Sequence, residues 1–468
     1  MSLTRSLVVL ASIFLEFNLP NATTWFYFSL LLVMALFFRF DRFLSLRNWD
    51  LLTLFFMAPG FLLLQEAHLL QYTVYQNDLN ELAKDRLQMR ATLLLHMGYI
   101  WLIAGSGYWF IRSFVDLALI RRPTMMPNLN KAGLACFTTV LLVSMTAVAI
   151  RRMPDVPPEQ ISKGSIMLTR IQEGATAVVN YQSANPELSK VDAQFWVEKS
   201  IVMLLHLAII IGLVLIGTVH FQDTSSGFSM ACLYLLVPYT ALNISKEHHV
   251  LPAVFLVWAI FAYRKPIIAG SLLGLAAGSI FFPLLLFPLW FGFYRGRGAI
   301  RFGIAFLAIT LASLAITAMV LSSRGEFSNH LNIALSLSDW QAWKKPQTES
   351  IWTGSHWAYR IPVFVVYMTF VSLTIFWPTP RNLGQVVAQT AAVVIGVQFW
   401  YADQGGVYVL WYLPLLLVLV FRPNLTERRP PPIHYDSDWL WRSFRAIARM
   451  AQRVTRRTTR TTNQMAPQ

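Results

Sequence analysis

Apolar runs recur from one end of this chain to the other, and most approach the length that crosses a bilayer, about 20 helical residues. They lie at 24–38, 50–70, 92–111, 132–150, 200–219, 228–244, 250–263, 266–291, 302–322, 361–377, 385–400 and 405–421. A soluble domain carries about 25% charged residues, whereas only 13% of these 468 residues are charged. The pattern predicts an all-α polytopic membrane protein with about 12–14 transmembrane helices.

The basic residues predict the orientation of these helices, because cytoplasmic loops are enriched in Lys and Arg. If the C-terminus is cytoplasmic, the inside loops collect Arg39, Arg42, Arg47, Arg112, Arg121, Arg122, Lys131, Arg264, Lys265, Arg295, Arg297, Arg301 and Arg381. Three longer segments, 71–91, 151–199 and 323–360, then lie outside. Much of the net charge of +15 belongs to the tail 422–468. Such a tail is typical of a cytoplasmic end attracted to anionic lipid, so we expect no nucleic-acid partner.

The run 266–291 has basic residues at both ends, Arg264–Lys265 before it and Arg295–Arg301 after it. A single span would place one of these groups outside, against the positive-inside rule. A hairpin of two half-length helices that breaks near Gly278–Pro283 keeps both groups in the cytoplasm. Non-helical backbone at membrane depth is tolerated where it is buried in protein or lines a cavity, so such a break indicates a functional site.

The outer segment 151–199 has two apolar stripes at helical spacing, Ile161–Val178 and Leu188–Phe195, separated by Asn185–Pro186. This spacing predicts two amphipathic helices outside the membrane. They form either a lid on the outer leaflet or a small packed cap without chemistry.

The outer segment 323–360 combines tryptophans with basic residues. Trp352 and Trp357 offer flat faces to the C–H faces of a sugar, or they anchor the loop at the interface. Arg324, His356 and Arg360 are candidate ligands of a phosphate, because cationic side chains pair with phosphate oxygens.

A short turn between two apolar runs carries Lys246, Glu247, His248 and His249. Ionisable residues at a membrane boundary are costly unless they have a use. Adjacent histidines point about 100° apart on a helix, so we expect a phosphate-binding or proton-handling role rather than a metal site. The alternative is a solvated turn capped by charges.

The interiors of the runs contain few ionisable residues, chiefly Glu66, His68, His96 and His206. Ion-coupled transporters bury charged relays near the membrane midplane. The concentration of polar residues at the outer ends therefore favours an enzyme that works at the membrane surface.

The stretch EHHVLPAVFLVWAIFAYRKPIIAGSLLGLAAGSIFFPLLLFPLWFGFYRGRG, Glu247–Gly298, resembles the middle of GT-C class integral-membrane glycosyltransferases. The most similar group is the polyprenol-phosphate-mannose-dependent α-mannosyltransferases. In that group a polar outer turn leads through a helix to a basic pair, an AG-LLGLA run and a proline. Here these features are Arg264–Lys265, Ala269–Ala277 and Pro283.

Two features of the family pattern differ in this chain. The Gly-Gln-x-Asn outer turn is replaced by Glu247-His248-His249, and the lysine before the proline falls on Ile280. Counting back two spans from Glu247 matches the family's catalytic carboxylate to Asp155.

The resemblance implies a GT-C-like fold and transfer of a sugar from a polyprenyl-phosphate-linked donor to a lipid or glycan acceptor at the outer face. Asp155 would be the general base, and His248, His249 and Arg324 or Arg360 would hold the leaving phosphate. No metal or cofactor is expected. The partners are the donor, the acceptor and membrane lipids.

The chain then divides into N-terminal helices 1–131, which are a candidate addition to the core, a GT-C-like module 132–421, and a basic tail 422–468 with an amphipathic helix. Leu7–Phe17 is either an uncleaved first helix or an interfacial one. We expect a multi-pass protein of the plasma membrane, or of the inner membrane in a bacterium. The alternatives to an enzyme are a lipid or solute transporter or flippase, and a membrane scaffold without catalysis.

Overall fold

The computed structural model describes residues 22–76, 80–118, 125–151, 186–322, 342–343, 349–378, 381–402 and 404–432, and within these ranges every regular element is helical. Six helical segments there are long and apolar enough to cross a membrane: Leu46–Gln76, Glu81–Ala118, Lys131–Ile150, Trp196–His220, Ala299–Met319 and Leu383–Trp400. This agrees with an all-α polytopic protein.

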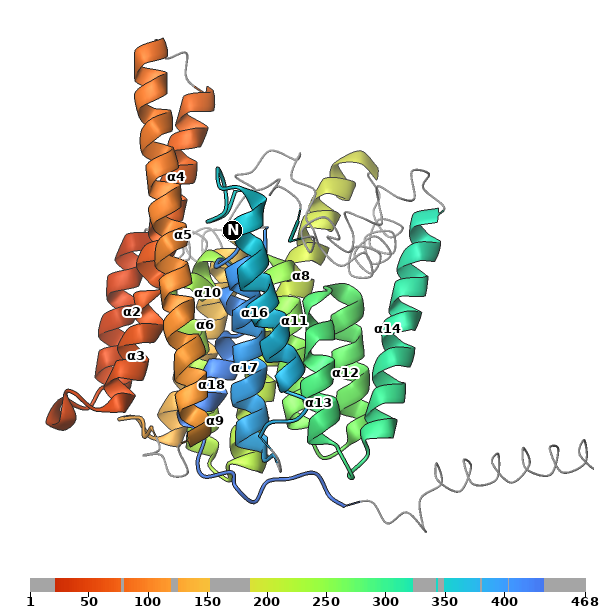
Figure 1. The fold of residues 1–468 in the computed structure, drawn as a ribbon. Helices are drawn as coiled ribbons and strands as arrows, with labels where there is room; N and C mark the ends of the chain where they lie inside the picture. Colours follow the sequence, from red (N-terminus) through yellow and green to blue (C-terminus); the bar gives the residue numbers. More distant parts are fainter. Residues whose placement is uncertain are drawn as a thin grey trace, which may run out of the picture.

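Most of the α-helices alternate between up and down (Figure 1), whereas α3 continues into α4 within one segment, Leu46–Gln76. They are α2 (Ala22–Phe37), α3 (Leu46–Phe56), α4 (Ala58–Gln76), α5 (Glu81–Ala118), α6 (Lys131–Arg151), α8 (Pro186–Leu215), α9 (Thr224–Leu236), α10 (Pro238–Leu242), α11 (Glu247–Phe261), α12 (Pro266–Ser279), α13 (Phe287–Phe293), α14 (Ala299–Ser322), α16 (Arg360–Leu373), α17 (Leu383–Trp400) and α18 (Leu413–Phe421). We name the two ends from Figure 1: the α4–α5 tip lies at the upper face, and the connection between α13 and α14 lies at the lower face.

Several apolar runs that the sequence presents as full spans are shorter helices. Helix α12 has 14 residues and α18 has nine, and 14 residues of helix extend about 21 Å against a hydrocarbon core of about 30 Å. Proline at the first turn of α10, α12, α13 and α18 explains several of these starts, because the first turn of a helix needs no hydrogen bond from the backbone N–H that proline lacks.

The break predicted near Gly278–Pro283 is confirmed. Helix α12 ends at Ser279, Ile280 is extended, and the 3-10 helix η3 (Phe282–Leu286) leads into α13. The Tyr294 hydroxyl donates a hydrogen bond of 2.6 Å to the Tyr263 carbonyl, so the two ends of the hairpin meet at the lower face.

Helix α12 packs against α14 through glycines at four-residue spacing. A Cβ atom at Gly270 would lie 2.6 Å from the Phe302 carbonyl oxygen, and one at Gly274 would lie 2.7 Å from the Phe306 carbonyl oxygen. Small residues at this spacing let two membrane helices approach closely. The glycine run that carries the family resemblance is therefore also a helix-packing motif.

A network of four charged side chains is buried toward the lower face. The Arg112 guanidinium binds the two Asp50 carboxylate oxygens at 2.8 and 3.0 Å, and Arg422 Nε binds Asp116 Oδ2 at 2.7 Å. Each residue is at most 6% exposed. This corrects the expectation that the interior holds few charges and that Arg112 belongs to a cytoplasmic loop.

Two further arginines assigned to loops, Arg47 and Arg381, are also buried. Arg47 donates a 3.0 Å hydrogen bond to the Phe37 carbonyl at the end of α2, and Arg381 donates 3.0 Å bonds to the carbonyls of Leu289 and Trp377. Burial lowers the pKa of Arg381 to about 10, so it stays charged at neutral pH. These cations satisfy backbone carbonyls at helix ends rather than lipid headgroups.

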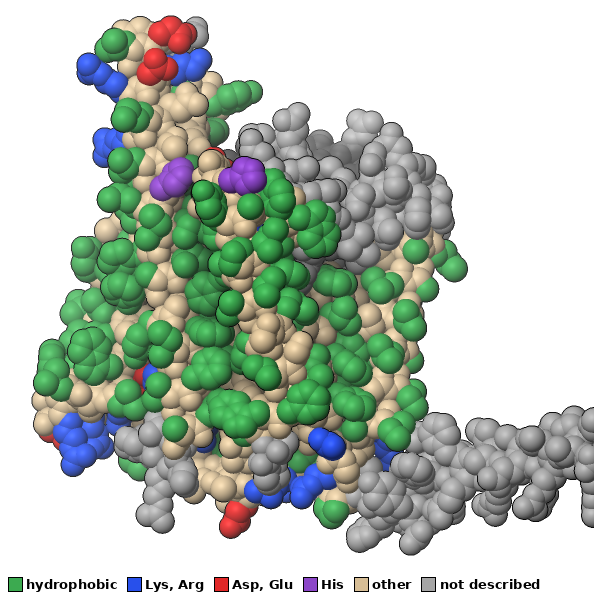
Figure 2. All heavy atoms as spheres, viewed as in Figure 1, with side chains coloured by type: hydrophobic (Ala, Val, Ile, Leu, Met, Phe, Trp, Pro, Cys, Tyr) green, Lys and Arg blue, Asp and Glu red, His purple; other side chains and the backbone are tan. Residues whose placement is uncertain are grey.

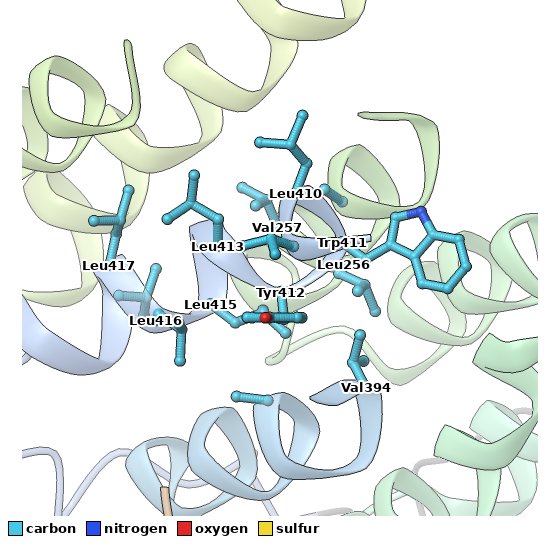
Figure 3. Close-up of a cluster of buried hydrophobic side chains, with 14 of the residues drawn as sticks. Leu256, Val257, Val394, Leu410, Trp411, Tyr412, Leu413, Leu415, Leu416 and Leu417 are labelled. Carbon is cyan, nitrogen blue, oxygen red and sulfur yellow. The ribbon is translucent and has the colours of Figure 1, made fainter. Parts of the chain in front are cut away.

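Helix α18 lies in the centre of the molecule. All its residues are buried, and Figure 3 shows the α18 leucines among Leu256 and Val257 of α11 and Val394 of α17. This packing fixes the preceding connection, residues 401–412, at the upper end of α18.

Of the remaining expectations, one is wrong and the others concern residues that the structure does not describe. The second amphipathic stripe, Leu188–Phe195, forms the first turns of α8, which continues without a break to Leu215, so it is not a separate helix. The first stripe, Ile161–Val178, the segment Leu7–Phe17 and the helix of the basic tail lie outside the described residues.

Candidate functional site

The polar turn Lys246–His249 forms the upper end of α11. Lys246 is the N-cap residue, and Glu247 lies in the first turn, where a negative charge is favourable beside the positive end of the helix dipole. His249 is fully buried and Glu247 is 7% exposed. The alternative that the sequence left open, a solvated turn, is therefore wrong for these two side chains.

Aromatic side chains of the α17–α18 connection cover the two histidines. The ring centroids of His249 and Tyr408 lie 5.0 Å apart, and Tyr408 stacks on Trp411 at 4.1 Å with 14° between the planes. Trp411 Nε1 donates a 2.9 Å hydrogen bond to the His248 carbonyl. Segments far apart in the sequence thus form one cluster.

The break in the hairpin joins this cluster. Phe282, at the start of η3, stacks on Trp411 with centroids 4.3 Å apart and 19° between the planes. We call Phe282, His248, His249, Tyr408 and Trp411 the upper cluster. The hairpin break predicted to indicate a site is therefore connected to the histidines through Trp411.

The connection itself is held by a side chain of α17. Gln398 Oε1 accepts a 2.9 Å hydrogen bond from the Gly406 backbone N–H, and Gly406 has φ +97°, a conformation that favours glycine. The Gly405–Gly406 pair therefore lets the chain turn sharply and present Tyr408 to His249.

Four polar side chains around the turn from α10 to α11 lack hydrogen-bond partners among the described residues. They are His249, through both ring nitrogens, and the hydroxyls of Tyr239, Thr240 and Ser245, and all these atoms are buried. Buried polar groups in proteins are normally hydrogen-bonded. Such a group of unpaired donors and acceptors is typical of a place that takes ordered water or a polar ligand.

The two histidine rings lie together rather than apart. Their centroids are 4.4 Å apart with 47° between the planes, because side-chain rotation in the first helical turn overrides the 100° separation expected from helix geometry. Within the described ranges, no group of three or more His, Cys, Asp or Glu residues could hold a metal ion.

Two carboxylates flank the upper cluster. Glu198, half-buried in the upper half of α8, lies close enough to Glu247 for the two charges to interact. Asp155, the base that the family resemblance implies, lies outside the described residues, as does Arg324.

Trp352 and Arg360 bind the upper end of α17. Trp352 Nε1 donates to the Phe399 carbonyl at 3.1 Å, and Arg360 Nε donates to the Trp400 carbonyl at 3.1 Å. These carbonyls belong to the last turn of α17, where intrahelical partners are missing. Arg360 is only 1% exposed, so its contact here is that of a helix C-terminal cap.

The other two predicted residues of this segment make local contacts. His356 is exposed, and its Nδ1 accepts a 3.3 Å hydrogen bond from the Ala358 backbone N–H at the start of the short 3-10 helix η4 (Trp357–Tyr359). The Trp357 ring lies 5.3 Å from the His356 ring. Both residues shape the entry into α16.

Reasoning from the sequence missed Phe282, Tyr408 and Trp411. The only signal for the latter two is the aromatic and glycine-rich stretch at 400–412, where the apolar run 385–400 ends and the run 405–421 begins. His206, in contrast, has a structural role, because its ring nitrogens pair with the Tyr234 hydroxyl at 2.9 Å and the Ile244 carbonyl at 3.3 Å.

Comparisons with protein-family models, curated proteins and solved structures found no match to this chain.

Proposed function

We propose that this chain is a membrane-embedded glycosyltransferase that moves a sugar from a polyprenyl-phosphate-linked donor to a lipid or glycan acceptor. The observation that carries the proposal is the buried, unpartnered His249 among aromatic rings, beside the interacting carboxylates Glu198 and Glu247. Polar groups, flat rings and carboxylates are the side chains that sugar transfer requires.

The placement of the upper cluster suits a donor held by lipid. Helices α8 and α14 rise above the upper end of the α12–α13 hairpin in Figure 1, so the cluster lies below the level of its neighbours. In the proposed reaction Tyr408 and Trp411 support the sugar, while His248 and His249 donate hydrogen bonds to the phosphate. Donors held in place beforehand stabilise the charge that develops on the leaving group.

The reaction is a displacement at the anomeric carbon. The acceptor hydroxyl forms the new C–O bond, the bond from the anomeric carbon to the phosphate oxygen breaks, and the proton passes to a carboxylate. Polyprenyl phosphate leaves with the bonding pair, and the configuration inverts. Asp155 is the proposed base from the family resemblance, and Glu247 and Glu198 are the carboxylates that the described residues offer.

We propose further that the upper face is extracytoplasmic and the lower face cytoplasmic, in a plasma or bacterial inner membrane. Exposed cations on the lower-face connections support this orientation, among them Arg39, Arg42, Arg264, Lys265 and Arg295. Cytoplasmic loops are enriched in such residues.

The test is a transfer assay in proteoliposomes. Purified protein is supplied with polyprenyl-phosphate mannose, and in parallel with glucose and galactose donors, together with extracted membrane lipids and glycans. Mass spectrometry should detect a product heavier by one hexose and the release of polyprenyl phosphate. Folded protein that gives no product with any donor would contradict the proposal.

A transporter is the second candidate, favoured by the interrupted hairpin of α12 and α13. Transporters bind their substrates at discontinuous helices. The same proteoliposomes separate the two functions if the donor carries a fluorescent lipid. Movement of the intact donor between leaflets, without a new glycosidic bond, would indicate transport.

A further inference from the structure

The lower end of the α12–α13 hairpin gathers basic side chains from two turns. Arg264 and Lys265 lie between α11 and α12, Arg295 and Arg297 lie between α13 and α14, and Arg301 lies in the first turn of α14. Arg264, Lys265 and Arg295 are exposed. Neither turn contains an Asp or Glu residue.

The fold holds these two turns together. The 2.6 Å hydrogen bond from Tyr294 to the Tyr263 carbonyl joins them directly. Gly296 and Gly298 have φ of +70° and +115°, which lets the second turn stay tight.

A third basic segment, which follows α18, contacts the turn between α13 and α14. Arg297 donates a 2.5 Å hydrogen bond to the Pro430 carbonyl, which follows Arg428 and Arg429 directly. Glu427 is the one acidic residue from Arg422 to Pro432. The cations of the three segments therefore greatly outnumber the carboxylates in them.

Exposed aliphatic side chains lie next to these cations in the sequence. Ile267 and Ile268 follow Lys265 and are 43% and 44% exposed, while Ile300 and Ile304 flank Arg301 and are 41% and 48% exposed. Figure 2 shows the same order on the surface, with a broad apolar band above and basic side chains along its lower edge. A phospholipid of the lower leaflet presents the matching order, with acyl chains above and a phosphate at the lower edge.

The cationic side chains of the lower half are of two kinds, buried with partners or exposed. Arg381 directs its guanidinium at backbone carbonyls, and Arg112 and Arg422 pair with carboxylates. Arg264, Lys265 and Arg295 instead extend from exposed turns. Like charges held this close repel one another, and a bound anion relieves that repulsion.

We propose that the surface formed by Arg264, Lys265, Arg295, Arg301 and the neighbouring isoleucines binds an anionic phospholipid. Its phosphate lies against the two basic turns, and its acyl chains lie along Ile267, Ile268 and Ile304. Basic groups between membrane helices at one leaflet bind anionic headgroups in this way. The binding does not depend on the proposed glycosyl transfer.

The test measures lipid retention by native mass spectrometry. The full chain is released from nanodiscs of equal parts phosphatidylglycerol and phosphatidylcholine, and the bound lipids are counted. We expect selective retention of phosphatidylglycerol. The triple variant Arg264→Gln, Lys265→Gln, Arg295→Gln should bind it on the order of 100-fold more weakly, since each cation near a membrane surface contributes about fivefold.

The matched control is Arg39→Gln, Arg42→Gln, Lys131→Gln, which removes three exposed cations of the lower face away from the hairpin. This variant should retain phosphatidylglycerol as the native chain does. Equal losses in the two variants, or no preference over phosphatidylcholine, would overturn the proposal. Displacement of the lipid by millimolar inorganic phosphate would also overturn it, because the site would then recognise a free anion.

Discussion

At the scale of single residues, Asp116 is the centre of the buried charge network. It pairs with Arg422, 306 residues away in the sequence, and lies 3.5 Å from Arg112 on its own helix. Arg112 in turn holds Asp50 of α3. Two carboxylates and two guanidinium groups thus join α3, α5 and the end of α18 with no net charge.

Replacing Asp116 by Asn should destabilise the chain strongly. The substitution leaves Arg422 buried with its charge uncompensated, and breaking one partner of a buried ion pair costs about 3–5 kcal/mol. The measurement is unfolding in detergent micelles followed by circular dichroism. The control Asp41→Asn alters an exposed carboxylate of the lower face, where a change within about 0.5 kcal/mol is expected. Equal effects of the two variants would contradict a structural role of the network.

The sequence does not reveal this network, for a physical reason. Asp50 and Arg112 stand at the margins of apolar runs, where a charge is as compatible with a loop as with a buried ion pair. Only the register of α3 against α5 and α18 decides between them. Paired charges separated by tens or hundreds of residues leave no local periodicity.

At the scale of elements, the α12–α13 hairpin is the feature that the sequence predicts best. Arg264–Lys265 and Arg295–Arg301 at both ends of one apolar run require the chain to return, and Pro283 with the preceding glycines locates the break. The contacts that the hairpin makes with other segments were not predictable in the same way. The stacking of Phe282 on Trp411 joins two segments that no spacing rule connects.

Close packing of α12 on α14 depends on the absence of side chains at the glycine face. A methyl group at Gly274 would meet the Phe306 backbone oxygen, so we expect Gly274→Ala to destabilise the chain by about 1–3 kcal/mol. The matched control is Gly107→Ala in α5, where a Cβ meets nothing within 4 Å. That substitution should be neutral or stabilising by up to about 1 kcal/mol. Unfolding in detergent measures both, and an unaffected Gly274→Ala variant would refute the packing assignment.

At the scale of the whole molecule, the two faces differ in their chemistry. The lower face carries exposed cations. Other cations near it are buried, where they form ion pairs or donate hydrogen bonds to backbone carbonyls. Near the upper face, the ends of short helices bring unpartnered histidine and hydroxyl groups together with aromatic rings. The difference between the two faces was predictable in outline from the charges of the loops. The position of the upper cluster below the upper ends of α8 and α14 was not, because it depends on helix lengths that only the folded chain reveals.

The orientation predicts which positions an impermeant thiol reagent reaches. In a background with Cys136 and Cys232 replaced by alanine, Lys84→Cys near the α4–α5 tip should be labelled on intact cells. Lys265→Cys at the lower face should be labelled only after the membrane is permeabilised. The reverse pattern would show that the basic connections lie outside.

The central claim is that the upper cluster is a site of sugar transfer, and the rate of hexose transfer by His249→Gln in proteoliposomes tests it most directly. His96→Gln is the control, because His96 is an exposed histidine on α5, and both variants must first show native-like unfolding in detergent. We expect His249→Gln to lower kcat by about 100-fold or more, as the loss of one preorganised donor does in other enzymes, while His96→Gln keeps the native rate. Native rates in both variants would contradict the account.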